Sequence, residues 1–313
     1  MSIRCLVTGG AGFIGSHLVE RLVRDGHHIR VVDNLITGFR HNLAAVADEI
    51  EFIEGALEDP ATAQQAVAGV EVIFHEAALP SVPRSVQDPF TSQRCGEVAT
   101  LTLLAAAARA GSVRRVIYAS SSSIYGDTPT LPKVETMPPR PLSPYAATKL
   151  AGEGYMSAYA ALSGMDTLCL RYFNVFGPRQ DPNNQYAGVI ARFVQVMARG
   201  EPPTIYGDGT ATRDFTPIAN VVQANLLAMN APGRFQGEVF NIACGRQISL
   251  QRLVQQLNAL FGTDLNPVHA APRPGDIAHS CADITKASRL LGYSPRVDFE
   301  TGLRELVYQT PRL

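Results

Sequence analysis

The chain has 313 residues, 46% of them hydrophobic, and its 27 Lys and Arg nearly balance its 28 Asp and Glu, which gives a formal net charge of −1. Intermixed basic and acidic residues leave no footprint for nucleic acid or for an anionic membrane surface. No apolar run approaches the roughly 18 residues of a membrane span, and the length suits one large α/β domain or two modest ones.

Five cysteines are scattered along the chain without a Cys-x-x-Cys pair. Their odd count, and an N-terminal stretch from Met1 to Arg4 that runs straight into an expected strand, give no sign of a disulfide framework or a signal peptide. We therefore expect reduced thiols, a cytoplasmic location and no metal site. The absence of repeats and low-complexity linkers predicts interleaved domains.

The first elements predict a dinucleotide site. A short apolar run at residues 4–7 leads into the glycine-rich segment 8–15, and the residues after it have helical apolar spacing. In a strand–turn–helix of this kind, Gly9 permits the tight turn, Gly12 lets the backbone approach a pyrophosphate, and Gly15 lets helix and strand pack closely. We expect the phosphates at the helix N-terminus, near free N–H groups and the positive end of the dipole.

Residues 29–33 form a second expected strand, which ends in Asp33, 18 residues after Gly15. A carboxylate here suits the ribose hydroxyls of NAD and repels the 2′-phosphate of NADP. No basic residue follows in Asn34-Leu35, which also favours NAD. The alternative is an ordinary βαβ turn in which the aspartate is structural.

Strands and helices then alternate, which is typical of a doubly wound parallel sheet. The expected strands are 51–54, 70–75 and 115–119, and the expected helices are 61–68 and 99–110. Ligands bind beyond the carboxyl ends of such strands. The segments 77–79 and 120–123 are therefore candidates for lining the cofactor.

A helix is predicted to begin near Pro144, with Ser143 as its N-cap. It places Tyr145 and Lys149 four residues apart on one face. A lysine ammonium near a phenol favours the phenolate and lowers its pKa, so the pair is a candidate proton acceptor at neutral pH. By itself, Tyr-x-x-x-Lys also occurs by chance on solvated helices.

Together, the segment Thr8–Gly15, Asp33, Ser121 and the pair Tyr145/Lys149 resemble an extended short-chain dehydrogenase/reductase over nearly the whole chain. Further segments are similar to UDP-sugar 4-epimerases, namely 171–178, 213–215 and 273–276. Segments 81–85 and 179–183 look most like those of bacterial UDP-N-acetylglucosamine 4-epimerases.

The resemblance implies a Rossmann-type doubly wound parallel sheet with a smaller interleaved C-terminal substrate-binding lobe. Residues 1–173 are expected to form the NAD-binding domain. Residues 174–313 form mainly the UDP-sugar lobe, with about 214–246 returning to the Rossmann sheet. The family also implies a homodimer, for which the helices near 99–110 and 145–162 are candidates.

The resemblance also implies the site residues. The catalytic residues are Ser121, Tyr145 and Lys149. The NAD-binding residues are Gly9, Gly12, Phe13, Ile14, Gly15, Asp33, Asn34, Thr37, Gly38, Leu57, Ala77, Ala78, Tyr145, Lys149 and Tyr172. The substrate-binding residues are Ser81, Ser122, Asn174, Gln180, Gly188, Val189, Arg192, Tyr206, Arg213, Arg273, Asp276 and Ser280. Two of these, Arg213 and Arg273, are expected to clamp the diphosphate with their guanidinium groups.

Serines stand where other branches of the family carry catalytic carboxylates. Nucleotide-sugar dehydratases have an Asp-Glu pair after the catalytic Ser or Thr, and decarboxylases have a Glu before the later Tyr-Gly. Here these positions are Ser122 and Ser123, which disfavours elimination and decarboxylation. Four residues depart from the family pattern close to the expected ligands, namely Ala56, Pro80, Gly96 and Gly188.

The implied reaction is 4-epimerisation of a UDP-sugar through transient oxidation at C4, with Tyr145 as the base and no net redox change. Ser280 stands where glucose-restricted epimerases carry a bulky Tyr, which leaves room for an N-acetyl group. UDP-N-acetylglucosamine and UDP-N-acetylgalactosamine are the expected substrates, with their uronates as further candidates. The alternatives are a UDP-glucose or UDP-glucuronate 4-epimerase and a non-catalytic sensor of NAD or nucleotide sugars.

Overall fold

The computed structural model describes residues 2–181, 188–271 and 277–310. Within these ranges, seven strands form one parallel sheet in the order β11-β6-β5-β4-β1-β2-β3. The strands are β1 (Arg4–Thr8), β2 (His28–Asp33), β3 (Ile50–Glu54), β4 (Val72–His75), β5 (Arg115–Ser121), β6 (Asp166–Tyr172) and β11 (Glu238–Ile242). The predicted doubly wound parallel sheet is confirmed.

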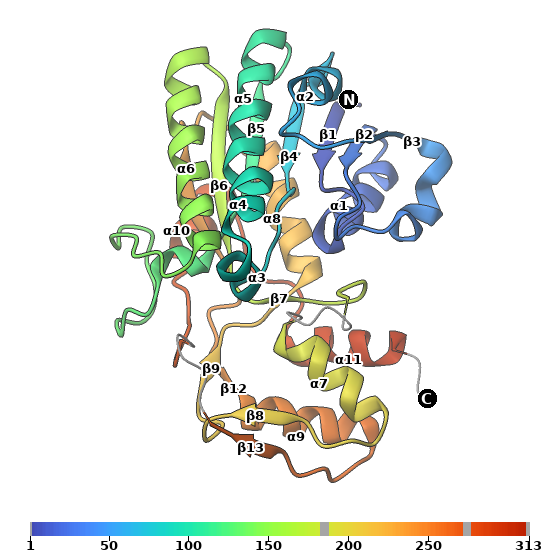
Figure 1. The fold of residues 1–313 in the computed structure, drawn as a ribbon, viewed down its shortest axis with the longest axis vertical. Helices are drawn as coiled ribbons and strands as arrows, with labels where there is room; N and C mark the ends of the chain where they lie inside the picture. Colours follow the sequence, from blue (N-terminus) through green and yellow to red (C-terminus); the bar gives the residue numbers. More distant parts are fainter. Residues whose placement is uncertain (1, 182–187, 272–276, 311–313) are drawn as a thin grey trace.

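Helices cover both faces of this sheet (Figure 1). Successive strand residues point to opposite faces, so each strand contributes to two cores. In β1, Cys5 and Val7 belong to the core that includes α1 and α8, whereas Leu6 belongs to the core that includes α2, α5 and α6. The helices on the first face are α1 (Phe13–Arg24), α8 (Ile218–Asn230) and α10 (Thr285–Leu291). Those on the second are α2 (Pro60–Val67), α5 (Ala99–Ala110) and α6 (Pro144–Ser163).

The C-terminal segments divide between two places. The strand β11 and the helices α8 and α10 lie with the central sheet, while other helices build a lobe below it in Figure 1 around a third core. This lobe contains α7 (Val189–Ala198), α9 (Leu250–Phe261) and α11 (Phe299–Gln309), and the paired strands β8 (Thr204–Tyr206) with β13 (Val268–Ala270) and β9 (Thr212–Arg213) with β12 (Ile248–Ser249). A short pair, β7 (Val175–Phe176) and β10 (Thr216–Pro217), connects the two parts.

Several element boundaries differ from the sequence prediction. The first helix begins at Phe13, directly after the glycine turn, and β4 begins at Val72 because Val70 closes a turn on Val67. The strand β5 runs through Ser121, so the serines expected after the strand are divided between this strand and the short helix η3 (Ser122–Tyr125). Three further helical segments, α3 (Val82–Gln87), α4 (Pro89–Gln93) and the π-helical turn η2 (Arg94–Val98), precede α5, and η1 (Arg40–Glu49) follows β2.

A buried histidine links the sheet to the segment after β4. His75 is fully buried; its Nδ1 lies 2.7 Å from the Thr8 hydroxyl and its Nε2 lies 2.8 Å from the Thr100 hydroxyl. Because Thr100 donates its own hydrogen to the carbonyl of Gly96, Nε2 carries the imidazole proton and Nδ1 accepts one from Thr8. The Thr8 oxygen in turn accepts the backbone N–H of Ala77 at 3.1 Å. This chain of bonds requires a neutral imidazole.

Acid is therefore expected to destabilise the fold through His75. Burial lowers the pKa of this histidine from 6.5 to about 3. Between these two pH values the unfolded chain binds a proton at His75 and the folded protein does not. Between pH 6.5 and 5 this linkage removes about 2 kcal/mol from the free energy of unfolding. Urea unfolding of the wild type and of His75→Gln at several pH values checks it, because other titrating groups cancel in the difference. Parallel pH dependences of the two proteins would contradict the assignment.

Candidate active site

The glycine turn after β1 brings backbone close to backbone. Gly9 has φ +65°, and a Cβ there would lie 2.8 Å from the Cα of Ala77. A Cβ on Gly15 would lie 2.3 Å from the carbonyl oxygen of Gly9, so this position admits no side chain. At the N-cap of α1, Gly12 contributes no side-chain hydrogen bond. The first N–H groups of the helix therefore have no capping side chain competing for them, as a phosphate site requires.

The carboxylate of Asp33 ends β2 beside this turn. It accepts hydrogen bonds from the backbone N–H groups of Ala11 at 2.9 Å and Leu35 at 2.8 Å, and burial raises its pKa. A Cβ on Gly38 would lie 2.9 Å from an Asp33 carboxylate oxygen, so glycine keeps the space beside the carboxylate open. Asp33 thus also organises the turn, which was the alternative role considered for it.

A cavity of about 500 Å³ runs along the carboxyl ends of the strands. It brings together most of the predicted site residues: Gly9, Gly12, Phe13, Ile14, Gly15, Asp33, Asn34, Thr37, Leu57, Ala77, Ala78, Ser81, Ser121, Ser122, Tyr145, Lys149, Tyr172, Asn174, Gln180 and Gly188. The predicted residues Gly38, Val189, Arg192, Tyr206, Arg213 and Ser280 are described but do not line it. Arg273 and Asp276 lie outside the described residues.

The helix α6 places the candidate catalytic pair as expected. The Ser143 hydroxyl caps it by accepting the N–H of Ala146 at 3.2 Å, and Pro144 occupies its first turn. Lys149 is buried, and its Nζ donates to the carbonyl of Ala119 in β5 at 2.6 Å. Nζ lies 6.0 Å from the centre of the Tyr145 ring.

The prediction that Lys149 lowers the pKa of Tyr145 is wrong in this structure. Burial raises the pKa of Tyr145 to about 12, and the group that lowers it is Ser121, through a hydrogen bond. Burial also lowers the pKa of Lys149 to about 8. The physical reason is that the ammonium is bonded to Ala119 rather than to the phenol, so desolvation outweighs charge attraction.

Serines at the end of β5 complete this cluster. Ser121 accepts hydrogen bonds from the backbone N–H of Ser123 at 3.2 Å and from its hydroxyl at 2.9 Å. The adjacent Ser120 donates instead to Glu153, which forms a buried ion pair with Arg171. Consecutive residues of a strand face opposite ways, so Ser121 contacts Ser123 while Ser120 contacts Glu153.

Three residues predicted to bind substrate line the cavity between β6 and α7. Gln180 donates to the carbonyl of Val175 at 3.4 Å, and a Cβ on Gly188 would lie 3.2 Å from the Gln180 amide nitrogen. Asn174, in the left-handed region at φ +34°, donates to the carbonyl of Asp214 at 3.1 Å. The glycine at 188 therefore gives the amide of Gln180 the room that an alanine would take.

Arg213 and Ser280 lie next to each other but do not line the 500 Å³ cavity. The carbonyl of Thr212 accepts from the Arg213 guanidinium at 2.9 Å and from the backbone N–H of Ser280 at 3.0 Å. Ser280 is buried.

The unexpected glycine at 96 has a packing reason, since a Cβ there would lie 2.9 Å from the Thr148 hydroxyl of α6.

Three residues that were not among the predicted site residues also line the cavity, namely Glu76, Arg179 and Ile277. A signal for Glu76 was present, because it is an acidic residue placed directly after a fully buried strand. Arg179 forms an ion pair with Glu20 of α1. No sequence pattern connects Arg179 with Glu20, which lies 159 residues earlier in the chain.

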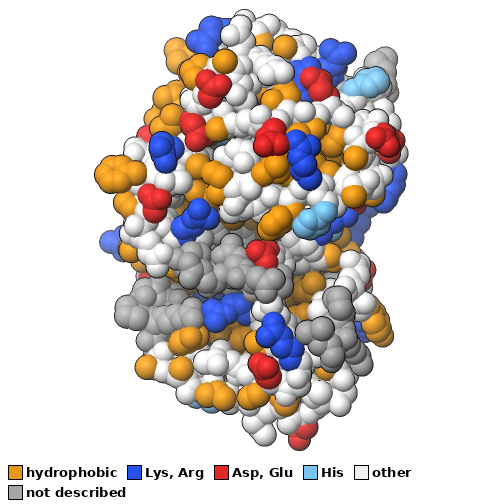
Figure 2. Space-filling model, turned by 45° about the vertical axis from the view of Figure 1, so that its right-hand side comes forward, with side chains coloured by type: hydrophobic (Ala, Val, Ile, Leu, Met, Phe, Trp, Pro, Cys, Tyr) orange, Lys and Arg blue, Asp and Glu red, His pale blue; other side chains and the backbone are white. Residues whose placement is uncertain are grey.

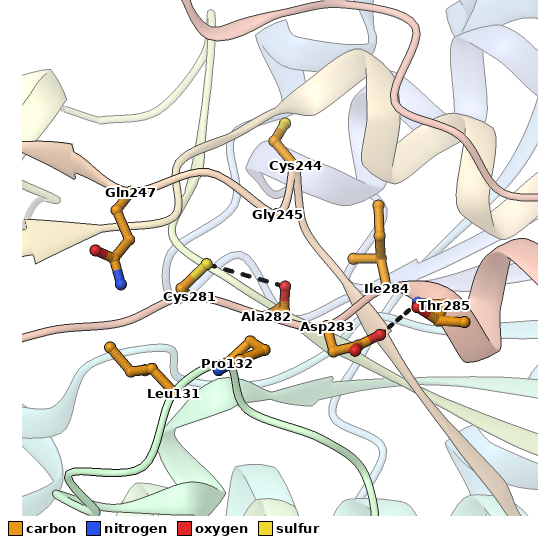
Figure 3. Close-up of a pocket in the computed structure, with 10 residues that line it drawn as sticks. All are labelled: Leu131, Pro132, Cys244, Gly245, Gln247, Cys281, Ala282, Asp283, Ile284 and Thr285. Carbon is orange, nitrogen blue, oxygen red and sulfur yellow. Dashed lines mark hydrogen bonds between the residues drawn. The ribbon is translucent and has the colours of Figure 1, made fainter.

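A second cavity, of about 510 Å³, opens beside the segment that follows β11 (Figure 3). Cys244 and Cys281 line it, but the side chain of Cys244 points away from Cys281, and burial raises the pKa of both thiols. The buried carboxylate of Asp214 organises this region by accepting the backbone N–H groups of Cys244 and Ala282 at 3.0 and 3.1 Å. The cavity thus presents unreactive thiols beside a structural carboxylate.

Among the described residues, no group of three or more His, Cys, Asp or Glu side chains could hold a metal ion. No helix in the same ranges is long and apolar enough to cross a membrane. On the face shown in Figure 2, basic and acidic side chains are interspersed.

The cavity fits NAD on the donor groups present. The glycine turn and the uncapped end of α1 suit a pyrophosphate, and the Asp33 carboxylate suits ribose hydroxyls. Lys149 and Tyr145 line the same cavity. Residues 5–243 match the model of the NAD dependent epimerase/dehydratase family.

Known proteins resemble the chain over nearly its full length. The UDP-glucose 4-epimerase of Mycolicibacterium smegmatis is 41% identical over 97% of both chains. The structure of the UDP-N-acetylglucosamine 4-epimerase from Methanobrevibacter ruminantium, in complex with UDP-N-acetylmuramic acid, is 38% identical with a TM-score of 0.93 and covers 98% of this chain and 97% of that chain. The Thermus thermophilus UDP-glucose 4-epimerase in complex with NAD is 36% identical, with a TM-score of 0.88 and 98% of both chains covered. The chain therefore belongs to the NAD-dependent epimerase/dehydratase family and is an NAD-dependent enzyme of its UDP-sugar 4-epimerase branch.

Proposed function

We propose that the protein interconverts UDP-N-acetylglucosamine and UDP-N-acetylgalactosamine by inverting the sugar at C4, with the corresponding uronates as further substrates. The observation that carries the reaction type is the convergence of Ser121, Tyr145 and Lys149 in the cavity that also contains the glycine turn. Ser122 and Ser123, next to this cluster, offer no carboxylate for elimination or decarboxylation at neutral pH.

The chemistry that NAD supplies when bound is the reversible acceptance of a hydride. In our proposal, Tyr145 takes the proton of the 4-hydroxyl and later returns it, and Ser121 donates a hydrogen bond to the 4-oxygen. Lys149 holds the nicotinamide ribose with its ammonium group. Lys149 is buried, and Tyr145 and Ser121 are half-buried in the cavity, which limits the access of water to the oxidised sugar between the two half-reactions.

Small residues support the choice of an acetamido sugar. Gly188 leaves room beside the Gln180 amide. The buried Ser280 stands where glucose-restricted members of the family carry a bulky tyrosine. We propose that Asn174 and Gln180 contact the sugar and that Arg213 and Arg273 clamp the diphosphate. UDP-glucose/UDP-galactose interconversion is the second candidate, because the Mycolicibacterium smegmatis relative is named for UDP-glucose.

A panel of UDP-sugars, incubated with protein as purified and without added NAD, tests the proposal by NMR. We expect C4 epimers of the acetamido sugars to form at least about tenfold faster than those of UDP-glucose. No epimerisation of any sugar would favour a sensor and contradict the proposed reaction. Epimerisation of UDP-glucose or UDP-glucuronate alone would contradict the proposed substrate.

Ser280→Tyr is expected to reduce epimerisation of UDP-N-acetylglucosamine by about tenfold or more, because its added ring would take the space proposed for the acetyl group. Ser280→Ala is the matched control and should keep the acetamido activity. Retained UDP-glucose turnover by Ser280→Tyr would show that the variant is folded. An equal loss for both sugars would contradict the proposed role.

We also propose the division into an NAD-binding domain at 1–173 and a mainly UDP-sugar-binding lobe at 174–313. A homodimer through α5 and α6 is proposed because exposed apolar side chains, including Leu101 and Leu162, lie on these helices. Sedimentation of the purified protein measures the association directly.

A further inference from the structure

Glu76 is a half-buried acidic residue that lines the cavity and that the proposed mechanism does not use. It follows β4 directly, and one of its oxygens, Oε1, accepts a hydrogen bond from the Tyr172 hydroxyl at 2.9 Å. Asn225 of α8 supports that hydroxyl by donating to it at 2.8 Å. The second oxygen, Oε2, is buried and has no hydrogen-bond partner among the described residues. The carboxylate is therefore firmly held on one side and unsatisfied on the other.

The charge of Glu76 acts on the candidate catalytic pair. Glu76 follows His75, which pairs with Tyr118 of β5, and Lys149 donates to the carbonyl of the next β5 residue, Ala119. At this position the Glu76 charge acts to raise the pKa of Tyr145 and of Lys149, against the burial that lowers the pKa of Lys149. Burial raises the pKa of Glu76 to about 7, and the Tyr172 bond and the Lys149 charge oppose this shift. A cation brought beside it would favour the ionised carboxylate further.

We propose that Glu76 is a positioning residue for the cofactor, whose negative charge stabilises the oxidised, positively charged nicotinamide over the reduced, neutral one. The inference rests on the proposed function, in which the C4–H bond breaks, its hydride moves to the ring and the hydroxyl proton moves to Tyr145. Each transfer reverses to complete epimerisation. With NAD bound in this cavity, an anion near the nicotinamide would disfavour the loss of its positive charge and favour the recovery of that charge.

This charge has a clear use in an epimerase. A ketosugar that escapes leaves the cofactor reduced, and that molecule of enzyme cannot begin another turnover without an oxidised ring. A carboxylate that keeps the reduced form scarce therefore protects the catalytic cycle. Lys149, as a cation in the same cluster, acts in the opposite direction, so the pair sets the balance between the two forms.

The test is the reduction potential of NAD bound to the purified holoenzyme, measured against a redox dye at pH 8 and without sugar. Glu76→Gln keeps an acceptor for Tyr172 but removes the charge. We expect it to raise the bound NADH:NAD⁺ ratio at a fixed potential about tenfold, which is about 30 mV for this two-electron couple. Glu76→Leu removes charge and acceptor and should shift the ratio in the same direction, which gives a second variant if one fails to fold.

A control variant separates the charge of Glu76 from the mere loss of a carboxylate in the cavity. Glu58→Gln removes another carboxylate of the same cavity, one that does not act on the pKa of Tyr145 or Lys149, and should leave the ratio unchanged. Equal ratios in Glu76→Gln and the wild type would overturn the inference. Because no sugar is present, failure of the proposed epimerase function would not produce that result.

Discussion

Tyr145→Phe is expected to lower kcat for C4 epimerisation by about 1000-fold, because phenylalanine keeps the half-buried ring but can neither take nor return the hydroxyl proton. Positioned acid–base groups contribute factors of roughly 100 to 10,000. The ring should pack in the same place in both proteins, so the variant should retain bound NAD. Rates by NMR and cofactor content after denaturation give the two readouts.

Ser121→Ala is the companion variant for this prediction. It removes the hydrogen bond that lowers the pKa of Tyr145, while burial continues to raise that pKa. We therefore expect a smaller loss than in Tyr145→Phe and a dependence on pH displaced toward higher values. Activity of Tyr145→Phe within tenfold of the wild type would show that another group transfers the proton.

Arg115→Met is expected to lower the free energy of unfolding by about 3–5 kcal/mol, the range for removing one partner of a buried ion pair. The guanidinium lies at the start of β5, pairs with Asp166 at 2.6 Å, and is buried. It also donates to four backbone carbonyls after and within the end of α8, at residues 228, 229, 231 and 233. The substitution leaves the Asp166 carboxylate and these carbonyls without their hydrogen-bond donor.

The adjacent arginine is a matched control for this experiment. Arg114 is half exposed, and its guanidinium lies 4.0 Å from Glu71, so Arg114→Met should cost less than about 1 kcal/mol. Denaturant unfolding of the two variants gives the comparison. Adding Asp166→Leu to Arg115→Met should recover part of the loss, because the unpaired carboxylate disappears. Similar stabilities of the two single variants would contradict the role assigned to Arg115.

Local signals in the sequence were sufficient for much of the site. The glycine turn, the acid at Asp33 and the capped start of α6 each depend on residues close together in the chain, where backbone sterics and capping act. The alternation of apolar strands and helices predicted the parallel sheet, and that prediction is confirmed. Parallel strands then require the segments after them to meet at one edge.

Tertiary packing decided what these residues experience. The pKa of Tyr145 depends on how completely other elements bury it, and the position of the Lys149 ammonium depends on a carbonyl of β5. Glu76 receives its support from Tyr172, 96 residues away. The sequence by itself determined which chemical groups the site contains, because glycine turns and helix caps are local. Only the tertiary structure decided their charge states and partners, because desolvation and hydrogen bonding depend on segments that meet only after folding.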